Sequence, residues 1–166
     1  MRLQIPLMLL SALALPAVAQ QTPSPDPPPA VRAARTDDLP GLWVMVALSK
    51  HAEVDVEDSL FAPYQLFYFD PNGGMKHMTS AQMFRQSQLA VFDAAPLVTR
   101  FTVDRRGTLL LMNPAWDAPR SYLCRLVIKD TPGDDPRLPR AGDILLSGTD
   151  GQGRPLWSKL LRKLNP

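Results

Sequence analysis

Apolar and polar residues alternate with a period of two along most of the chain after residue 37, and turn residues interrupt the alternation at short intervals. The segment 97–103 shows this pattern clearly, because Phe101 and Val103 fall on one face of an extended chain and Arg100 on the other. Such alternation predicts half-buried β-strands. Short connections between the strands predict antiparallel hairpins.

The connections carry the residue types that tight turns need. In Asp70-Pro71-Asn72-Gly73, the proline fixes φ, and the asparagine and glycine accept positive φ. Glycine-containing turns at 104–107 and 150–153 predict two more hairpins. The whole pattern predicts a mostly β protein with about eight strands in sequential order. An antiparallel meander of this length removes its exposed edges by closing into a barrel, whose interior has room for side chains or one small ligand.

One segment departs from the alternation. Thr79 and Gln82 can form a capping box, the residues after them favour a helix, and Pro96 limits its length. We therefore expect one helix near residues 80–93.

The first residues have the features of an export signal. Arg2 precedes an apolar run over 5–15, and Ala17-Val18-Ala19 provides small residues at the positions that signal peptidase recognises. The apolar run is shorter than the roughly 20 residues that a membrane-spanning helix needs. We interpret residues 1–19 as a signal peptide and expect a periplasmic or secreted protein with no membrane span.

A proline-rich segment follows the predicted signal peptide. Residues 20–36 contain five prolines, which disfavour both helix and sheet, so we expect a disordered linker there. Residues 37–166 remain as one domain, which is long enough for a single core. The formal net charge of +2 gives no indication of a nucleic-acid partner.

Three segments resemble a known family. Gly41-Leu42-Trp43 matches a Gly-x-Trp motif, the hairpin 66–75 is similar to a family hairpin, and the chain ends with the basic residues Lys159, Arg162 and Lys163. On these features the chain resembles small bacterial lipocalin-like, or calycin-type, barrel proteins. The resemblance implies an eight-stranded barrel and a small apolar ligand. It also implies that a basic residue of the last strand packs across Trp43, and Arg162 is the candidate.

The leading functional hypothesis is an apolar pocket inside the barrel. Aromatic and other large side chains expected to face inward are candidate ligand-binding residues, namely Trp43, Met45, Tyr68, His77, Phe101 and Tyr122. The alternative is that such residues fill the barrel completely. The protein would then act through its surface, as an envelope protein-interaction or inhibitor module. The mixture of large and small inward residues leaves both alternatives open.

A metal site and an active site are both less well supported by the sequence. Met75, His77, Met78 and Met83 have copper-binding chemistry, but alternation along a strand puts Met78 on the face opposite Met75 and His77. The acidic residues of segment 49–63 have no calcium-loop spacing. The chain has two histidines and no nucleophile elbow, zinc-protease or phosphate-loop motif. We therefore predict no metal, no cofactor and no enzymatic activity.

Two further side chains have alternative interpretations. Cys124, the single cysteine, falls on the inward face of a predicted strand, which favours a buried apolar role over a reactive thiol. Trp116 lies in a loop between Pro114 and Pro119. It is either an exposed anchor for a partner protein or a plug for one mouth of the barrel.

Overall fold

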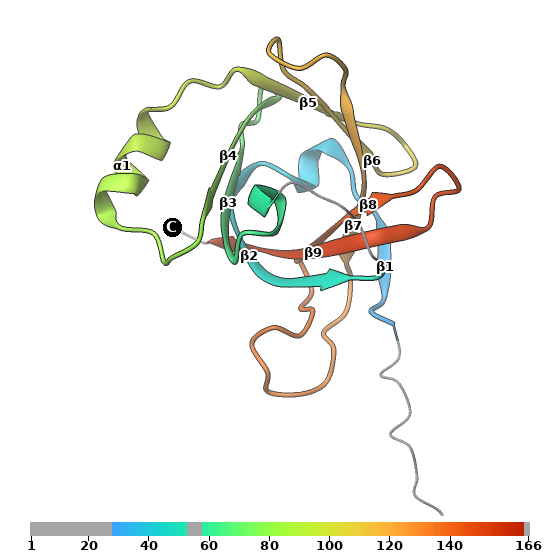
Figure 1. Cartoon of the computed structure of the whole chain (residues 1–166). Coiled ribbons are helices and arrows are strands. Elements are labelled where there is room, and N and C mark those ends of the chain that lie inside the picture. The colour runs from blue at the N-terminus through green and yellow to red at the C-terminus, as the bar shows by residue number, and fades with distance from the viewer. Residues whose placement is uncertain (1–27, 53–57, 165–166) are drawn as a thin grey trace, which may run out of the picture.

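A computed structural model describes residues 28–52 and 58–164, which form a closed antiparallel β-barrel (Figure 1). The mostly β, eight-stranded fold predicted from the sequence is thereby confirmed. The strands are β1 (Val31–Ala33), β2 (Gly41–Lys50), β3 (Tyr64–Phe69), β4 (Gly74–Ser80), β5 (Thr99–Val103), β6 (Thr108–Met112), β7 (Arg120–Val127), β8 (Ile144–Thr149) and β9 (Pro155–Leu164). The helices are α1 (Gln86–Ala94) and the short 3-10 helices η1 (Thr36–Asp38) and η2 (Asp58–Phe61).

Strands β2 to β9 pair in chain order, and β9 returns to β2 to close the barrel. Met45 of β2 pairs with Leu161 of β9, and the register shifts by one residue before Ala47 pairs with Leu160. A bulge of this kind bends a strand and increases its twist, which helps a sheet to close on itself. No helix in the described part of the chain is long and apolar enough to cross a membrane.

The fold begins earlier than the predicted boundary at residue 37. β1, within the expected linker, pairs with β7 through Val31 and Val127. β7 is longer than its neighbour β6, whose pairing with it reaches only Leu123. The next residues of β7 would present unpaired backbone groups at the sheet edge, and β1 supplies their partners. The predicted signal peptide and the first part of the linker lie outside the described residues.

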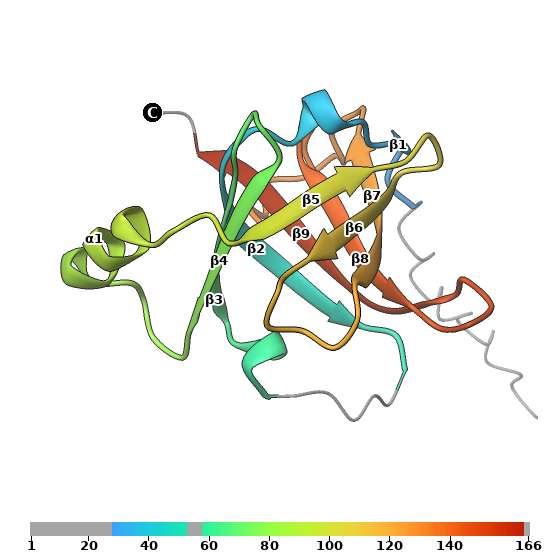
Figure 2. The same cartoon turned by 90° about the horizontal axis from the view of Figure 1, so that it is seen from above.

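One end of the barrel, here called the closed end, is filled by side chains. The segment around η1 lies across this end, while η2 lies at the opposite end (Figure 2). Leu39 is fully buried there, and its carbonyl accepts a hydrogen bond from Trp43 Nε1 at 2.7 Å. The core of the closed end also contains Ala34, Met45, Phe101, Cys124, Ile144 and Leu161.

The predicted hairpin turns depend on aspartate side chains as well as glycine. In the turn between β3 and β4, Asp70 Oδ1 accepts a hydrogen bond from the Asn72 backbone at 2.8 Å, and Gly73 adopts a φ of +82°. Asp104 plays the equivalent role between β5 and β6, where Gly107 has a φ of +78°. Glycine adopts positive φ without the steric penalty that other residues carry.

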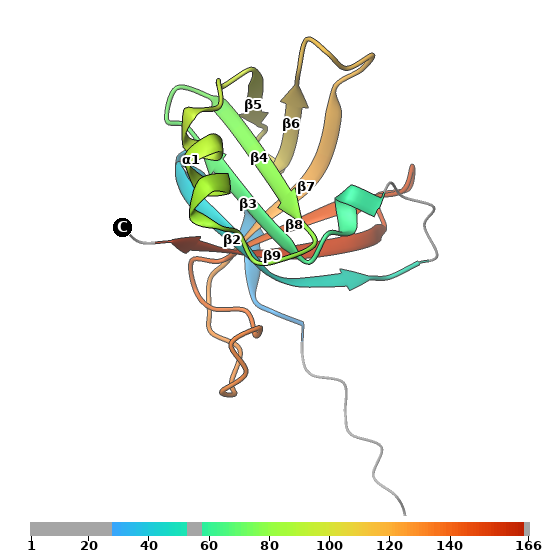
Figure 3. The same ribbon diagram turned by 60° about the vertical axis from the view of Figure 1, so that its left-hand side comes forward.

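The predicted helix is present but begins later than expected. Thr79, the expected N-cap, instead pairs with Gln65 in the β3–β4 ladder, so the backbone around it remains extended. α1 begins at Gln86, where the side chain of Gln88 accepts a hydrogen bond from the Arg85 backbone at 2.9 Å. The helix lies outside the barrel, over β3 and β4, and only Phe92 among its residues is buried (Figure 3).

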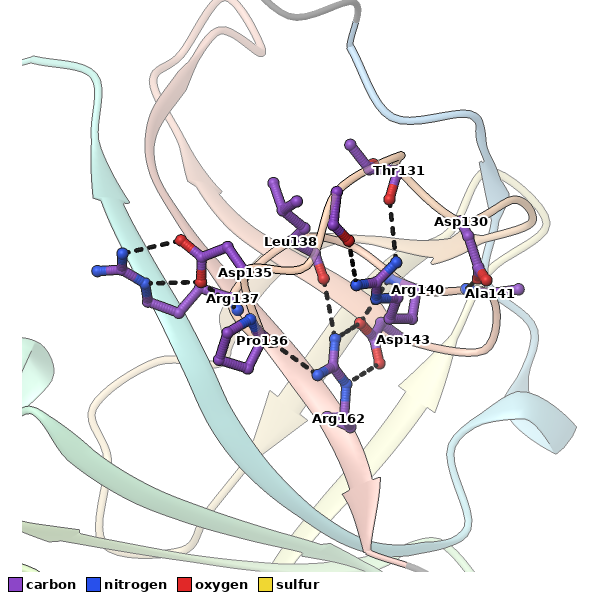
Figure 4. A network of polar contacts seen from close by, with 11 residues as sticks. Asp130, Thr131, Asp135, Pro136, Arg137, Leu138, Arg140, Ala141, Asp143 and Arg162 are labelled. Atoms are coloured by element: carbon purple, nitrogen blue, oxygen red, sulfur yellow. Dashed lines mark hydrogen bonds and ion pairs between the residues drawn. The ribbon is translucent and has the colours of Figure 1, made fainter.

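The last strand holds the connection between β7 and β8 through Arg162. Its guanidinium forms two hydrogen bonds with Asp143, at 3.0 and 2.7 Å, and also donates to two backbone carbonyls of the connection (Figure 4). Arg162 therefore does not pack across Trp43 as expected. Lys163 occupies that position, with its Nζ 5.7 Å from the ring centroid, because it is directly paired with Trp43 and a shift of one residue reverses the face.

Candidate functional site

The half of the barrel opposite the closed end contains a cavity of about 420 Å³. Inward-facing side chains from β3 to β9 line it, because alternate residues of each strand point to the interior. Most of the wall is apolar and is made by Phe67, Phe69, Met75, Leu109, Leu111, Leu146 and Trp157. The barrel is therefore packed at one end and hollow at the other.

The open end of the cavity is bordered by Leu60, Trp116 and Arg120. Trp116 is half-buried and packs against the core, and the guanidinium of Arg120 stacks over its indole at 4.4 Å. Of the two interpretations of Trp116, its position agrees with a side chain that partly covers the barrel mouth.

One part of the cavity wall lies between β4 and β5. These strands form only two residue pairs, Gly74 with Arg100 and Met75 with Thr99. Beyond them the strands separate, and the chain between the strands supplies the cavity wall through Ala95, Pro96 and Val98. Of these three lining residues, Pro96 and Val98 are also exposed to solvent.

Gln65, His77 and Lys159 form a polar cluster within the apolar wall, with Gln65 at its centre. The side-chain amide nitrogen of Gln65 donates to the carbonyls of Leu60 and Ala62, at 3.0 and 2.9 Å. This arrangement fixes the amide, so that Oε1 faces Lys159 Nζ at 2.8 Å and His77 Nε2 at 3.2 Å. One oxygen thus connects a side chain of β4 with one of β9.

The fixed amide also determines the tautomer of His77. Oε1 of Gln65 can only accept, so Nε2 of His77 carries the hydrogen and Nδ1 is left as an acceptor. Burial, together with the positive charge of Lys159, lowers the pKa of His77, so the ring is neutral at pH 7. The His77 ring stacks on Phe67 with the ring centroids 4.2 Å apart, and the residue remains exposed to solvent on its other side.

Lys159 is a cation in an apolar setting. Its side chain is 1% exposed, and its Nζ lies 5.0 Å from the ring of Trp157 and 5.8 Å from that of Phe67. Gln65 is its one hydrogen-bond partner among the described residues, and no carboxylate of that part of the chain pairs with it. Burial lowers the pKa of Lys159 to about 8.

The structure divides the six predicted ligand-binding residues among three places. His77 and Tyr122 line the cavity. Trp43, Met45 and Phe101 belong to the packed core at the closed end. Tyr68 lies on the outer face of β3, with Lys76 Nζ 5.5 Å from its ring. Because side chains alternate along β3, Tyr68 points away from the interior to which Phe67 and Phe69 contribute.

Sequence reasoning missed Lys159, Gln65 and Trp157. The sequence contained one usable signal, since Trp157, Lys159 and Leu161 alternate along the last strand and therefore share a face. A lysine between two large apolar residues on an inward face indicates a buried cation. The Lys159–Gln65 contact joins residues 94 positions apart, so it required the three-dimensional pairing of the strands.

The residues of the copper hypothesis do not converge. Met75 and His77 face the cavity, Met78 lies on the opposite face of β4, and Met83 is 73% exposed beyond the strand. Cys124 is fully buried, as predicted, and burial raises the pKa of its thiol to about 12. Glu53, Asp55 and Glu57 of the acidic segment lie outside the described residues.

The closed barrel is compatible with the lipocalin-like architecture that the sequence resembles. Comparisons with protein-family models, with curated proteins and with solved structures found no match.

Proposed function

We propose that this chain is an exported, lipocalin-like protein that binds one small apolar molecule non-covalently inside the barrel. The observation that carries the proposal is the cavity of about 420 Å³ in the open half of the barrel. Pockets for small molecules have volumes of roughly 300–1,000 Å³ and combine apolar walls with a few polar groups. The leucine and aromatic wall with its Gln65 cluster has this composition.

In this proposal the two halves of the barrel have different roles, one in stability and one in ligand binding. The packed closed end holds the strands in register, while the open half leaves side chains such as Leu111 and Leu146 beside empty space. A ligand that covers this surface gains roughly 25 cal/mol for each Å² of apolar area removed from water. Export to the periplasm or the medium, which the N-terminal residues predict, would place the binding site outside the cytoplasm.

The alternative function assumes that side chains fill the barrel completely and that the protein acts through its surface. The cavity does not agree with the first of these assumptions. One observation still favours a protein-interaction role as a second candidate. Apolar side chains are exposed on and beside α1, with Val91 68% and Val98 54% exposed. Exposed apolar residues that cluster on one surface are typical of interaction sites.

The proposed function can be tested by titration of the mature chain with the neutral fluorescent probe N-phenyl-1-naphthylamine. We expect saturable binding of one probe for each chain, with increased probe fluorescence. The variant Leu111→Trp fills the cavity and should abolish this signal. Thr102→Trp, on the exposed face of the neighbouring strand β5, is the matched control and should bind as the wild type does.

Both variants must first give the far-UV circular dichroism and cooperative unfolding of the wild type. Binding that does not saturate would contradict the proposal. Equal binding by Leu111→Trp and the wild type would also contradict it, and would instead direct attention to the outer apolar surface around α1.

A further inference from the structure

The charges of the cavity wall are of one sign. Among the described residues, the wall contains the cations Lys76, Arg120 and Lys159, and neither an aspartate nor a glutamate. His77 contributes no charge at neutral pH, since burial lowers its pKa. A cleft with one sign of charge and low-dielectric walls concentrates ligands of the opposite sign.

Two of these cations have other stabilising surroundings. Lys76 Nζ donates to the carbonyl of Asp93 at 2.8 Å and lies 5.1 Å from the ring of Phe92. Arg120 is exposed to solvent and stacks on Trp116. Neither side chain needs an additional anion for its charge to be solvated.

Lys159 differs from both of them. It is buried, and of the three N–H donors of its ammonium group Gln65 accepts one. The other charged residue in the buried part of the described chain, Asp143, has a full set of partners from Arg162 and the Arg140 backbone (Figure 4). Buried charges in proteins are ordinarily paired in that way, because an unpaired ion loses its hydration without compensation.

We propose that the ligand is an amphipathic anion, an alkyl carboxylate, whose carboxylate accepts hydrogen bonds from Lys159 while its tail lies against the leucines and aromatic rings of the cavity. This inference rests on the proposed function and specifies the chemical class of its ligand. The carboxylate supplies Lys159 with an anion that none of the described residues provides, and the hydrogen bonds between them are charge-assisted. Gln65 orients the ammonium group through its fixed Oε1.

The neutral His77 beside Lys159 helps to define the chemical class of the ligand, an alkyl carboxylate. Its Nε2–H is engaged by Gln65, and its Nδ1 is an acceptor that cannot donate to a carboxylate. The carboxylate therefore depends on the lysine. A ligand with an uncharged alcohol group in place of the carboxylate would fill the same apolar space without compensating the charge of Lys159.

The test compares sodium decanoate with 1-decanol, which share a ten-carbon chain, by isothermal titration calorimetry on the mature chain at pH 7. The quantity of interest is the ratio of their affinities. Lys159→Met keeps the side-chain length and removes the charge, so we expect the decanoate-to-decanol ratio to fall about ten-fold or more. Lys129→Met, which removes an exposed cation outside the cavity, is the matched control and should leave the ratio within a factor of about two of the wild type.

The outcomes separate this inference from the proposed function. An unchanged ratio in Lys159→Met, with both compounds still bound, overturns the inference and leaves the binding function in place. A third variant, Arg120→Gln, removes the cation at the open end, and a ratio that falls in it and not in Lys159→Met places the anion there and also overturns the inference. If neither compound binds to the wild type and N-phenyl-1-naphthylamine does not bind either, both proposals fail together.

Discussion

Replacement of Lys159 by methionine should stabilise the ligand-free protein. The ammonium group of Lys159 lies among Phe67, Trp157 and Gln65 with no carboxylate beside it in the described chain. Methionine has a similar length and makes favourable contacts with aromatic rings. The amide of Gln65 keeps partners for both of its atoms in the variant, since His77 still donates to Oε1. The exchange therefore removes a desolvated charge without leaving a buried polar atom unpaired.

The magnitude follows from the pKa of Lys159, which burial lowers from 10.5 to about 8. One pKa unit corresponds to about 1.4 kcal/mol, so the charge lowers the free energy of unfolding at pH 7 by about 3 kcal/mol. Between pH 8 and 10.5 the unfolded chain binds more protons than the folded chain. The free energy of unfolding of the wild type should therefore contain a component that increases with pH across this window.

The assay is urea unfolding of wild type and Lys159→Met, followed by far-UV circular dichroism at pH 7 and pH 10. We expect the variant to be more stable by about 3 kcal/mol at pH 7, and the difference to be mostly lost at pH 10. The groups that face Lys159 or share its cavity are His77, Tyr122, Lys76 and Arg120, and all are retained in both proteins. Burial raises the pKa of Tyr122, which lowers stability at high pH equally in both. A difference that is the same at both pH values, or a less stable variant at pH 7, would refute the reasoning.

Three other perturbations test separate parts of the structure. Gly148→Ala places a methyl group against the indole of Trp157 and should lower the free energy of unfolding by about 1–3 kcal/mol in urea, whereas Gly151→Ala, which meets no atom within 4 Å, should change it little. Arg162→Met leaves the buried Asp143 carboxylate without its ion pair and should lower the free energy of unfolding by about 3 kcal/mol, measured in the same way. The Cys124 thiol, whose pKa burial raises to about 12, should not react with an aromatic disulfide reagent at pH 8 until the protein is unfolded, and rapid reaction of the native protein would show that the thiol is accessible.

The barrel was predictable because its signals are local. Alternation along segments such as 97–103 identifies the strands, and turns such as Asp70-Pro71-Asn72-Gly73 identify the hairpins. The order of the strands then follows, because sequential hairpins in one sheet leave two edges that can pair with each other.

The errors arose where tertiary pairing outweighed local preference. Thr79 can cap a helix, but the ladder with β3 holds it extended, and α1 begins only at Gln86. Val31 lies in a segment expected to be a linker, yet it pairs with the free edge of β7. Neither competing interaction is visible in the residues next to it.

The candidate site was predictable only in part. His77 and Tyr122 were expected to face the interior and do line the cavity. Trp43, Met45 and Phe101 also face inward, but they fill the closed end, and alternation along a strand does not indicate the depth of a residue along the barrel axis. The position of the cavity depends on which strand ends meet, and thus on contacts between residues far apart in sequence, such as Gln65 and Lys159.

The central claim is that the open half of the barrel is a binding cavity, and methyl NMR tests it most directly. The mature chain with ¹³C-labelled leucine methyl groups would be titrated with N-phenyl-1-naphthylamine. We predict saturable shifts at Leu109, Leu111 and Leu146, which line the cavity, and little change at Leu39 and Leu161 in the closed end. Shifts confined to the exposed Leu89 and Leu97 beside α1, or no shifts at saturating probe, would contradict the account.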